Sequence, residues 1–302
     1  MNKIGLYVYK IILADAKTHK DKDLSDGNVG TSLANLFDKF ILENKTLKID
    51  GSIARSWILD PRPVDGFIRD GWIRYGSFGY QSTIHDSNTR EKKYDRLTSD
   101  IEEIPLYYHF WIPNKGPHGF AVFQSFGERS CVDLVRGAIS SYFNNNATKH
   151  RLFFKKFMPQ PEGELQNLTV KRLILIKKNF PKDQVEKVVG VLPSEVDVEI
   201  SIQARRRGKL GTFSDLAGRL LNKGGAKAFL YEGVEFERAM AEVQIGKTRR
   251  KVGLFGYSNH TGVIDVTEDV EISEDGHPTI ESISQEVRNL LVDFSLAYGK
   301  PV

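Results

Sequence analysis

Most hydrophobic residues of the chain fall in short runs with the composition of β-strands. Residues 4–13 (IGLYVYKIIL) are rich in Ile, Val and Tyr, which suits a strand buried on at least one face. Between residues 45 and 124, further runs such as EIPLYYHFWIP and HGFAVFQSF are separated by Gly and Pro, a spacing typical of a largely antiparallel sheet. Residues 82–100 are instead dense in Asp, Asn, Thr, Arg and Lys, which predicts a mobile surface loop.

Apolar residues at helical spacing predict four helices. These helices cover residues 31–43, 129–144, 212–221 and 279–298. The last of them follows directly after Pro278, which helix starts tolerate, and its apolar stripe makes it amphipathic. The predicted fold class is therefore α+β, or mixed α/β, with antiparallel-rich sheets and a C-terminal amphipathic helix.

The second half of the chain has a β pattern of its own. Its three β runs are KHRLFFKKFM, LTVKRLILIKK and VDVEISIQARR. A hairpin follows, in which two apolar strands, 241–245 and 251–255, flank a turn predicted at 246–250. Proline-bearing stretches separate the three runs and place a domain boundary near residue 160. We therefore expect a β-rich N-terminal α+β domain over 1–160 and a basic α+β domain over 161–302, ending in an acidic helical segment.

The composition is that of an ordinary globular chain. Its 302 residues are 40% hydrophobic and 27% charged, which excludes disorder and coiled coil as the main state. No apolar run is long enough to span a membrane, and residues 1–10 lack the apolar stretch of a secretory signal. The single cysteine, Cys131, excludes an intramolecular disulfide and a cysteine-rich zinc site. We expect a cytoplasmic protein with no membrane partner.

Charge is unevenly distributed along the chain. Residues 1–144 are nearly balanced, whereas residues 145–259 hold 22 basic against 12 acidic side chains, a net of +10. Residues 260–302 hold 2 basic against 9 acidic side chains, a net of −7. Clustered positive charge attracts polyanions over roughly 10 Å at moderate salt even when the total charge is small. The acidic segment could equally neutralise the basic one, within the fold or across a subunit interface.

Two dense basic clusters predict a nucleic-acid-binding surface. One lies at the end of a predicted strand and the other in the predicted hairpin turn; together they comprise Arg205, Arg206, Arg207, Lys209, Lys247, Arg249, Arg250 and Lys251. Side chains on turns can reach phosphate oxygens, and arginine does so with a two-pronged donor geometry. Basic pairs also occur on strands, as at Lys171 and Arg172, but strand neighbours point to opposite faces, so each pair gives one member to a shared surface.

A second candidate surface combines aromatic and basic residues. The segment RYGSFGY places Arg74, Tyr75, Phe78 and Tyr80 in what reads as a glycine-rich turn, an arrangement that single-strand binders use. The run HGFAVFQSF is also aromatic, but its alternation is better explained as a core strand than as a base-stacking surface.

Carboxylates in the second half of the chain raise the alternative of a metal-dependent nuclease. Such a site needs two or three carboxylates around a divalent ion. Glu235, Glu237 and Glu242 lie in an apolar strand, where the first two would share a face and the third would join them only through a bulge near 238–240. Cys131 sits at a predicted helix start but is better explained as a small packing residue than as a nucleophile.

The leading hypothesis is a non-catalytic component of a cytoplasmic multi-subunit assembly that binds DNA or RNA, either as a homo-oligomer or with a protein partner. Replacing either basic cluster should weaken binding to all sequences and reduce its salt dependence. No cofactor is expected, apart from a divalent metal in the nuclease alternative. A third reading is a protein–protein interaction subunit without affinity for nucleic acid. A microbial role in antiviral defence is compatible with such a chain.

Overall fold

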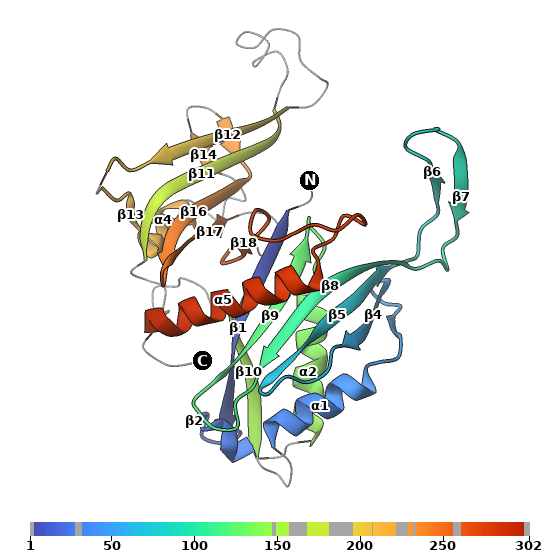
Figure 1. Cartoon of the computed structure of the whole chain (residues 1–302), viewed down its shortest axis with the longest axis vertical. Helices are drawn as coiled ribbons and strands as arrows, with labels where there is room; N and C mark the ends of the chain where they lie inside the picture. The colour runs from blue at the N-terminus through green and yellow to red at the C-terminus, as the bar shows by residue number, and fades with distance from the viewer. Residues whose placement is uncertain are drawn as a thin grey trace. The chain divides into compact units, whose positions relative to one another are not determined.

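The computed structural model describes residues 3–27, 32–146, 149–156, 168–180, 196–206, 208–221, 229–231, 234–255 and 261–298 (Figure 1). These residues form an α+β fold that is dominated by antiparallel sheet, and the C-terminal helix is present, as predicted. The chain divides into two compact units. Unit 1 comprises Met1–Val8, Lys156–Val270 and Gln285–Val302, and unit 2 comprises Tyr9–Lys155 and Glu271–Ser284.

Unit 2 contains most elements of the first half of the chain. They are the second part of strand β1 (Ile4–Asp15), strands β2 (Asp21–Lys22), β3 (Lys48–Asp50), β4 (Arg55–Pro61), β5 (Ile68–Ser77), β6 (Ser82–His85), β7 (Lys92–Arg96), β8 (Glu102–Trp111), β9 (Gly119–Phe126) and β10 (His150–Lys156), the short 3-10 helix η1 (Leu24–Gly27), and helices α1 (Leu33–Glu43) and α2 (Val132–Asn146). Both helices lie within two or three residues of their predicted bounds.

The sheet of unit 2 has the strand order β1-β9-β8-β5-β4-β3, with β2 and β10 also paired to β1. β9 is buried along almost its whole length, which confirms the prediction of a core strand. Helix α1 starts at the cap residue Ser32 and packs its apolar face on this sheet. There, the Phe37 ring meets Phe110 edge-on, with 5.2 Å between centroids, and the Phe40 ring stacks on Trp57 at 6.3 Å.

The sequence predicted a mobile surface loop over residues 82–100; the segment is largely exposed, but residues 82–96 form a β-hairpin. β6 and β7 pair antiparallel, with Ile84 opposite Tyr94, and the hairpin projects from the ends of β5 and β8 (Figure 1). Nearly every side chain of the hairpin is exposed. Because neither face is buried, its strands do not need the alternating apolar residues that mark a half-buried strand. Arg96, the one buried residue of β7, donates to backbone carbonyls at the hairpin base and pairs with Glu102.

Unit 1 contains the elements of the second half of the chain. They are strands β11 (Thr169–Phe180), β12 (Val196–Gln203), β13 (Gly211–Thr212), β14 (Phe229–Tyr231), β15 (Val234–Phe236), β16 (Arg238–Ile245), β17 (Thr248–Phe255) and β18 (Ile264–Asp265), helix α4 (Phe213–Leu221), and most of helix α5 (Ile280–Tyr298). The sheet order is β12-β11-β16-β17-β18, followed by the start of β1. The described division falls between Lys155 and Lys156, whereas the sequence placed a boundary near 160; β1 and α5 contribute residues to both units.

The β16–β17 hairpin has a two-residue turn rather than the five-residue turn that the sequence predicted. Ile245 pairs with Thr248, so only Gly246 and Lys247 lie between the strands. Gly246 has φ +57°, and a Cβ there would come within 2.8 Å of the backbone oxygen of Asp293 on helix α5. Glycine is therefore required both by the turn and by the close approach of the helix.

Candidate nucleic-acid interface

The first basic cluster lies on a loop whose two ends are both attached to β11. Strand β12 ends at Gln203, after which the chain bulges away from the sheet. The backbone N–H of Ala204 donates to the carbonyl of Lys171 (2.9 Å), and the N–H of Leu210 donates to the carbonyl of Val170 (3.0 Å). The loop thus leaves and rejoins the same strand at neighbouring residues, which restricts its position.

Internal hydrogen bonds hold the loop in a tight turn. The N–H of Gly208 donates to the carbonyl of Arg205 (2.7 Å), and the ammonium of Lys171 donates to the carbonyl of Gly208 (2.7 Å). A Cβ on Gly208 would lie 3.0 Å from the Arg205 carbonyl oxygen, so this approach favours glycine. The loop backbone is consequently preorganised, and it brings the Lys171 side chain to the same edge of the sheet.

The described basic side chains of the loop face solvent. Arg205, Arg206 and Lys209 are exposed, and none of them forms an ion pair with another residue within the described ranges. Arg207, the fourth member of the predicted cluster, lies outside the described residues. Three cations on one anchored turn can therefore meet an anion without first giving up a carboxylate partner.

Two further arginines extend this positive charge across the sheet. On strands β11 and β17, Arg172 and Arg249 approach the carboxylate of Glu242 on β16, at 3.7 Å and 3.6 Å. The Nε of Arg172 is buried and has no hydrogen-bond partner within the described part of the chain. Both guanidinium groups thus share one carboxylate, and the three side chains together keep a net charge of +1.

These residues make up what we call the basic loop surface. Its members are Lys171, Arg172, Arg205, Arg206, Lys209 and Arg249, with Glu242 among them. Three of the cations come from the loop, Lys171 and Arg172 from β11, and Arg249 from β17, which is separated from β11 by β16. Six positive charges against one negative charge leave a clear excess. Toward the other end of β12, the exposed Glu199 limits this surface.

The second basic cluster is largely occupied by carboxylates. Lys251 forms an ion pair with Glu268 (2.9 Å); although burial acts to lower the pKa of the lysine, this carboxylate raises it. Lys247, by contrast, keeps an exposed side chain, because the bond to Asp293 (3.3 Å) is donated by its backbone N–H. Because β17 begins at Thr248, the next residues alternate between the two faces of the strand instead of fanning out from a turn.

Arg250 points to the face covered by helix α5 and is buried. Its guanidinium pairs with Glu286, and it lies 3.6 Å from Asp293 and 3.7 Å from Asp269. Burial raises the pKa of Glu286; Arg250 acts to lower it, and the two neighbouring aspartates raise it. The acidic C-terminal segment thus neutralises this part of the basic segment inside the fold, and Arg250 is not available at the surface.

The three carboxylates of the nuclease alternative lie in different surroundings. Glu235 is on β15, which belongs to a separate two-stranded sheet, whereas Glu242 is on β16 of the main sheet. Glu237 lies between these strands and accepts a hydrogen bond from the ammonium of Lys177 (2.6 Å). The pairing of β16 with β17 does shift register at Ala239, as a bulge would require. Within the described ranges, no three His, Cys, Asp or Glu side chains are grouped to hold a metal ion.

The aromatic and basic candidates lie in unit 2, where Arg74 and Tyr80 contact other side chains of the chain. Arg74 and Tyr75 belong to strand β5, so the prediction of a turn was wrong for them, and Arg74 pairs with Asp60 (3.0 Å). Phe78 is half-buried after the strand ends. The Tyr80 ring is exposed, but the guanidinium of Arg96 lies 4.2 Å from its centroid. Its ring is thus partly covered by a cation of the same chain.

Cys131 is a packing residue, as the sequence indicated. It lies directly before helix α2 and is buried, and this burial raises the pKa of its thiol to about 12. A thiol with that pKa stays protonated at neutral pH and is a poor nucleophile.

Comparison of the chain with protein-family models and with curated protein sequences finds no match. No described helix is long and apolar enough to cross a membrane. Function therefore has to be inferred from the side chains and their arrangement.

The sequence identified the loop arginines, but it did not show which other basic residues belong to the basic loop surface and which are buried. The pair Lys171 and Arg172 was visible in the sequence, and the structure shows what each contacts: the ammonium of Lys171 donates to the carbonyl of Gly208 in the loop, and Arg172 approaches Glu242 on β16. The partners of Arg250 lie 19 to 43 residues further along the chain, and no local pattern marks them.

Proposed function

We propose that this protein binds DNA or RNA through backbone phosphates at the basic loop surface, without catalysing a reaction on them. The observation that supports the proposal most directly is the exposure of Arg205, Arg206 and Lys209 on an anchored turn, without ion pairs to the described residues. Phosphate contacts of this kind depend on charge and not on sequence. The protein therefore binds nucleic acid with little base preference.

We expect the protein to act in the cytoplasm within an oligomer or a heteromeric assembly. The feature that favours a protein partner is the projecting β6–β7 hairpin, on which Ile84, Tyr94 and Leu97 are each about half exposed. Exposed apolar side chains gathered on one element are typical of interaction sites. Light scattering coupled to size-exclusion chromatography tests self-association, and substitution of these side chains by serine should abolish any that is found.

The phosphate-binding proposal is tested with a triple variant, Arg205→Ala, Arg206→Ala and Lys209→Ala. Three lost phosphate contacts should reduce the slope of log K against log salt by about 2.7 for duplex DNA, which is about 40-fold less affinity lost between 50 and 200 mM salt. Fluorescence anisotropy with labelled single- and double-stranded DNA and RNA measures this slope, with magnesium present and absent.

A control variant that loses the same number of charges distinguishes the effect of the basic loop surface from the effect of the net charge of the chain. Lys17, Lys20 and Lys115 are exposed lysines of unit 2, and their joint replacement by alanine removes the same three charges. This control should keep the salt slope of the unmodified protein. Equal slopes for the unmodified protein and for the loop variant would refute the assignment of the surface.

The variant Glu242→Gln distinguishes binding from the nuclease alternative. Because Glu242 is the carboxylate shared by Arg172 and Arg249, its neutralisation should tighten binding to nucleic acid. If Glu242 instead holds a catalytic metal, the variant should lose magnesium-dependent cleavage. Cleavage that requires both magnesium and Glu242 would overturn the non-catalytic proposal.

A further inference from the structure

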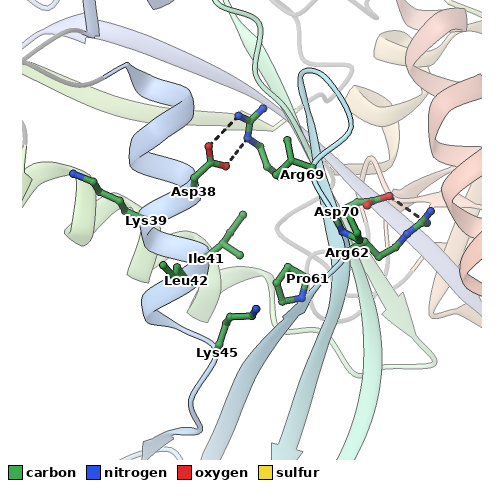
Figure 2. Close-up of a pocket in the computed structure, with 11 residues that line it drawn as sticks. Asp38, Lys39, Ile41, Leu42, Lys45, Pro61, Arg62, Arg69 and Asp70 are labelled. Carbon is green, nitrogen blue, oxygen red and sulfur yellow. Dashed lines mark hydrogen bonds and ion pairs between the residues drawn. The ribbon is translucent and has the colours of Figure 1, made fainter.

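Unit 2 contains a pocket that no part of the proposed function uses. Its volume is about 380 Å³, and it lies between helix α1 and the β4–β5 connection (Figure 2). Pockets that bind small molecules typically measure about 300–1,000 Å³ and have mainly apolar walls with a few polar groups. All of its lining residues belong to unit 2, whereas the basic loop surface belongs to unit 1.

Apolar side chains form two opposite walls of this pocket. Ile41 and Leu42 come from α1 and Pro61 from the end of β4 (Figure 2). Pro63 and Val64 lie in the connection that follows β4. Leu42 is 67% exposed and Val64 is 55% exposed, although both are large and apolar. Exposed apolar side chains on both sides of one opening are typical of a ligand site, because a ligand would remove them from water.

Both acidic residues of the pocket are already paired with arginines. The carboxylate of Asp38 accepts two hydrogen bonds from Arg69, at 2.8 Å and 3.1 Å, and this bidentate pair bridges α1 and β5 at one end of the pocket (Figure 2). Asp70 is buried and lies 3.6 Å from Arg62. The carboxylates therefore do not set the charge of the remaining surface.

A lysine supplies the uncompensated charge. Lys39 and Lys45 both line the pocket. The ammonium of Lys45 lies on the side of α1 that faces Pro61, whereas that of Lys39 is directed away from the strands (Figure 2). Both lysines are exposed, and neither forms an ion pair within the described part of the chain. Of the two lysines, Lys45 is the one whose ammonium faces the pocket (Figure 2), and this single cation complements a ligand that carries a single negative charge.

We propose that this pocket binds a small amphipathic carboxylate, with its apolar body between Ile41 and Pro61 and its carboxylate on Lys45. A carboxylate carries one charge at neutral pH, which one ammonium can balance, whereas a phosphate monoester carries about 1.5 to 2 charges. The apolar walls favour a ligand with an apolar body, because such a body removes their surface from water. A fully polar anion gains no such stabilisation from them. The ligand class is therefore an aliphatic or aromatic monocarboxylate.

The test uses anilinonaphthalene sulfonate as a fluorescent probe of the pocket and octanoate as the competing carboxylate. Octanol and octylamine serve as neutral and cationic competitors with the same apolar chain. Octanoate should displace the probe at concentrations at which the other two do not. No displacement by octanoate, or equal displacement by octanol, would overturn the proposal.

Two charge-reversal variants locate the site, one within α1 and one just after its C-cap residue Asn44. Lys45→Glu should weaken octanoate binding by about tenfold or more, as expected for loss of one charge-assisted contact. Lys39→Glu makes the same change in charge but should leave the affinity within about twofold. Val64→Glu, which places an anion at the mouth, should weaken binding as well. All three positions are exposed, so thermal unfolding should be unchanged.

The results for the variants also distinguish this site from the proposed function. Equal octanoate affinities for Lys45→Glu and Lys39→Glu would overturn the assignment of Lys45. Binding of octanoate by the triple loop variant should equal that of the unmodified protein, because the two sites share no residue. Loss of nucleic-acid binding alone would thus leave the pocket proposal intact, and loss of octanoate binding alone would leave the phosphate surface intact.

Discussion

Replacement of Arg250 by methionine removes the cation that three carboxylates share in unit 1. The guanidinium pairs with Glu286 and lies within 3.7 Å of Asp293 and Asp269. Methionine is similar in length and apolar, so it fills much of the same space without charge. The variant therefore tests the electrostatic role of Arg250 more than its packing.

The size of the effect follows from the burial of the three partners. The side chains of Glu286 and Asp293 are each 9% exposed, whereas that of Asp269 is 46% exposed. Loss of Arg250 leaves the first two as buried carboxylates without a cation, and breaking a buried pair in this way costs about 3–5 kcal/mol of unfolding free energy. Asp269 can turn to water and adds little.

Urea unfolding followed by circular dichroism measures this cost. Arg249→Met is the matched control, because Arg249 is the adjacent residue, is 65% exposed and lies 3.6 Å from Glu242. An exposed pair of this kind contributes about 0–1 kcal/mol, so the control should unfold at nearly the same urea concentration as the unmodified chain. The double variant Arg250→Met with Glu286→Gln should recover part of the loss, since it removes one of the two buried charges.

The stability deficit of Arg250→Met should depend on pH, because the buried partner Glu286 can take up a proton. Burial raises the pKa of Glu286, so the folded chain holds this proton more tightly than the unfolded chain does. The stability from this group is therefore complete at acid pH and is lost as the pH rises through the raised folded-state pKa. Without Arg250, which acts to lower that pKa, Glu286 is protonated over a wider range. The deficit of Arg250→Met should shrink as the pH falls from about 7 to about 5.

Two results would refute this reasoning. A loss below about 1 kcal/mol, no greater than that expected for an exposed pair, would mean that Glu286 and Asp293 reach water when Arg250 is absent. A deficit that stays constant across the pH range would mean that packing, and not charge, accounts for the loss.

Two other substitutions and one labelling experiment test separate parts of the fold. Tyr107→Phe removes the hydroxyl that donates to Asp70 (2.6 Å) in the interior of unit 2, and should lower the unfolding free energy by about 1–3 kcal/mol in urea. Gly246→Ala brings a Cβ within 2.8 Å of the backbone oxygen of Asp293 at a positive φ and should cost about 2–3 kcal/mol; an unchanged melting temperature would contradict the close approach of α5. Burial raises the pKa of Cys131 to about 12, so a maleimide should label this thiol only after unfolding, and rapid labelling of the folded chain would show that it is accessible.

The sequence was a sound guide wherever local pattern and tertiary burial agreed. The helices predicted over 31–43 and 279–298 are present because each has an apolar stripe that lies against a sheet. The core strand β9 was predicted from its dense apolar run. The position of the loop at 204–206 and 208–210 also followed from the sequence, since the alternation of β12 ends just before it.

The sequence-based prediction failed in two places. One is a hairpin whose side chains are not buried, and the other is a turn that is shorter than predicted. The β6–β7 hairpin has no buried face, so its residues carry no strand periodicity. The turn after Ile245 has two residues instead of five, and this difference moved Arg249 and Arg250 from a turn onto a strand. Because neighbouring residues of a strand face opposite ways, one of them became exposed and the other buried.

By itself, then, the sequence determined the class of fold, most of the elements and the presence of a basic loop, because these depend on residues close together in the chain. Only the tertiary structure decided which charges remain available. The pairing of Arg250 with Glu286 spans 36 residues and that of Arg69 with Asp38 spans 31 residues. Charge at a surface depends on which side chains meet after folding, and that depends on strand register and helix placement, which no local spacing records.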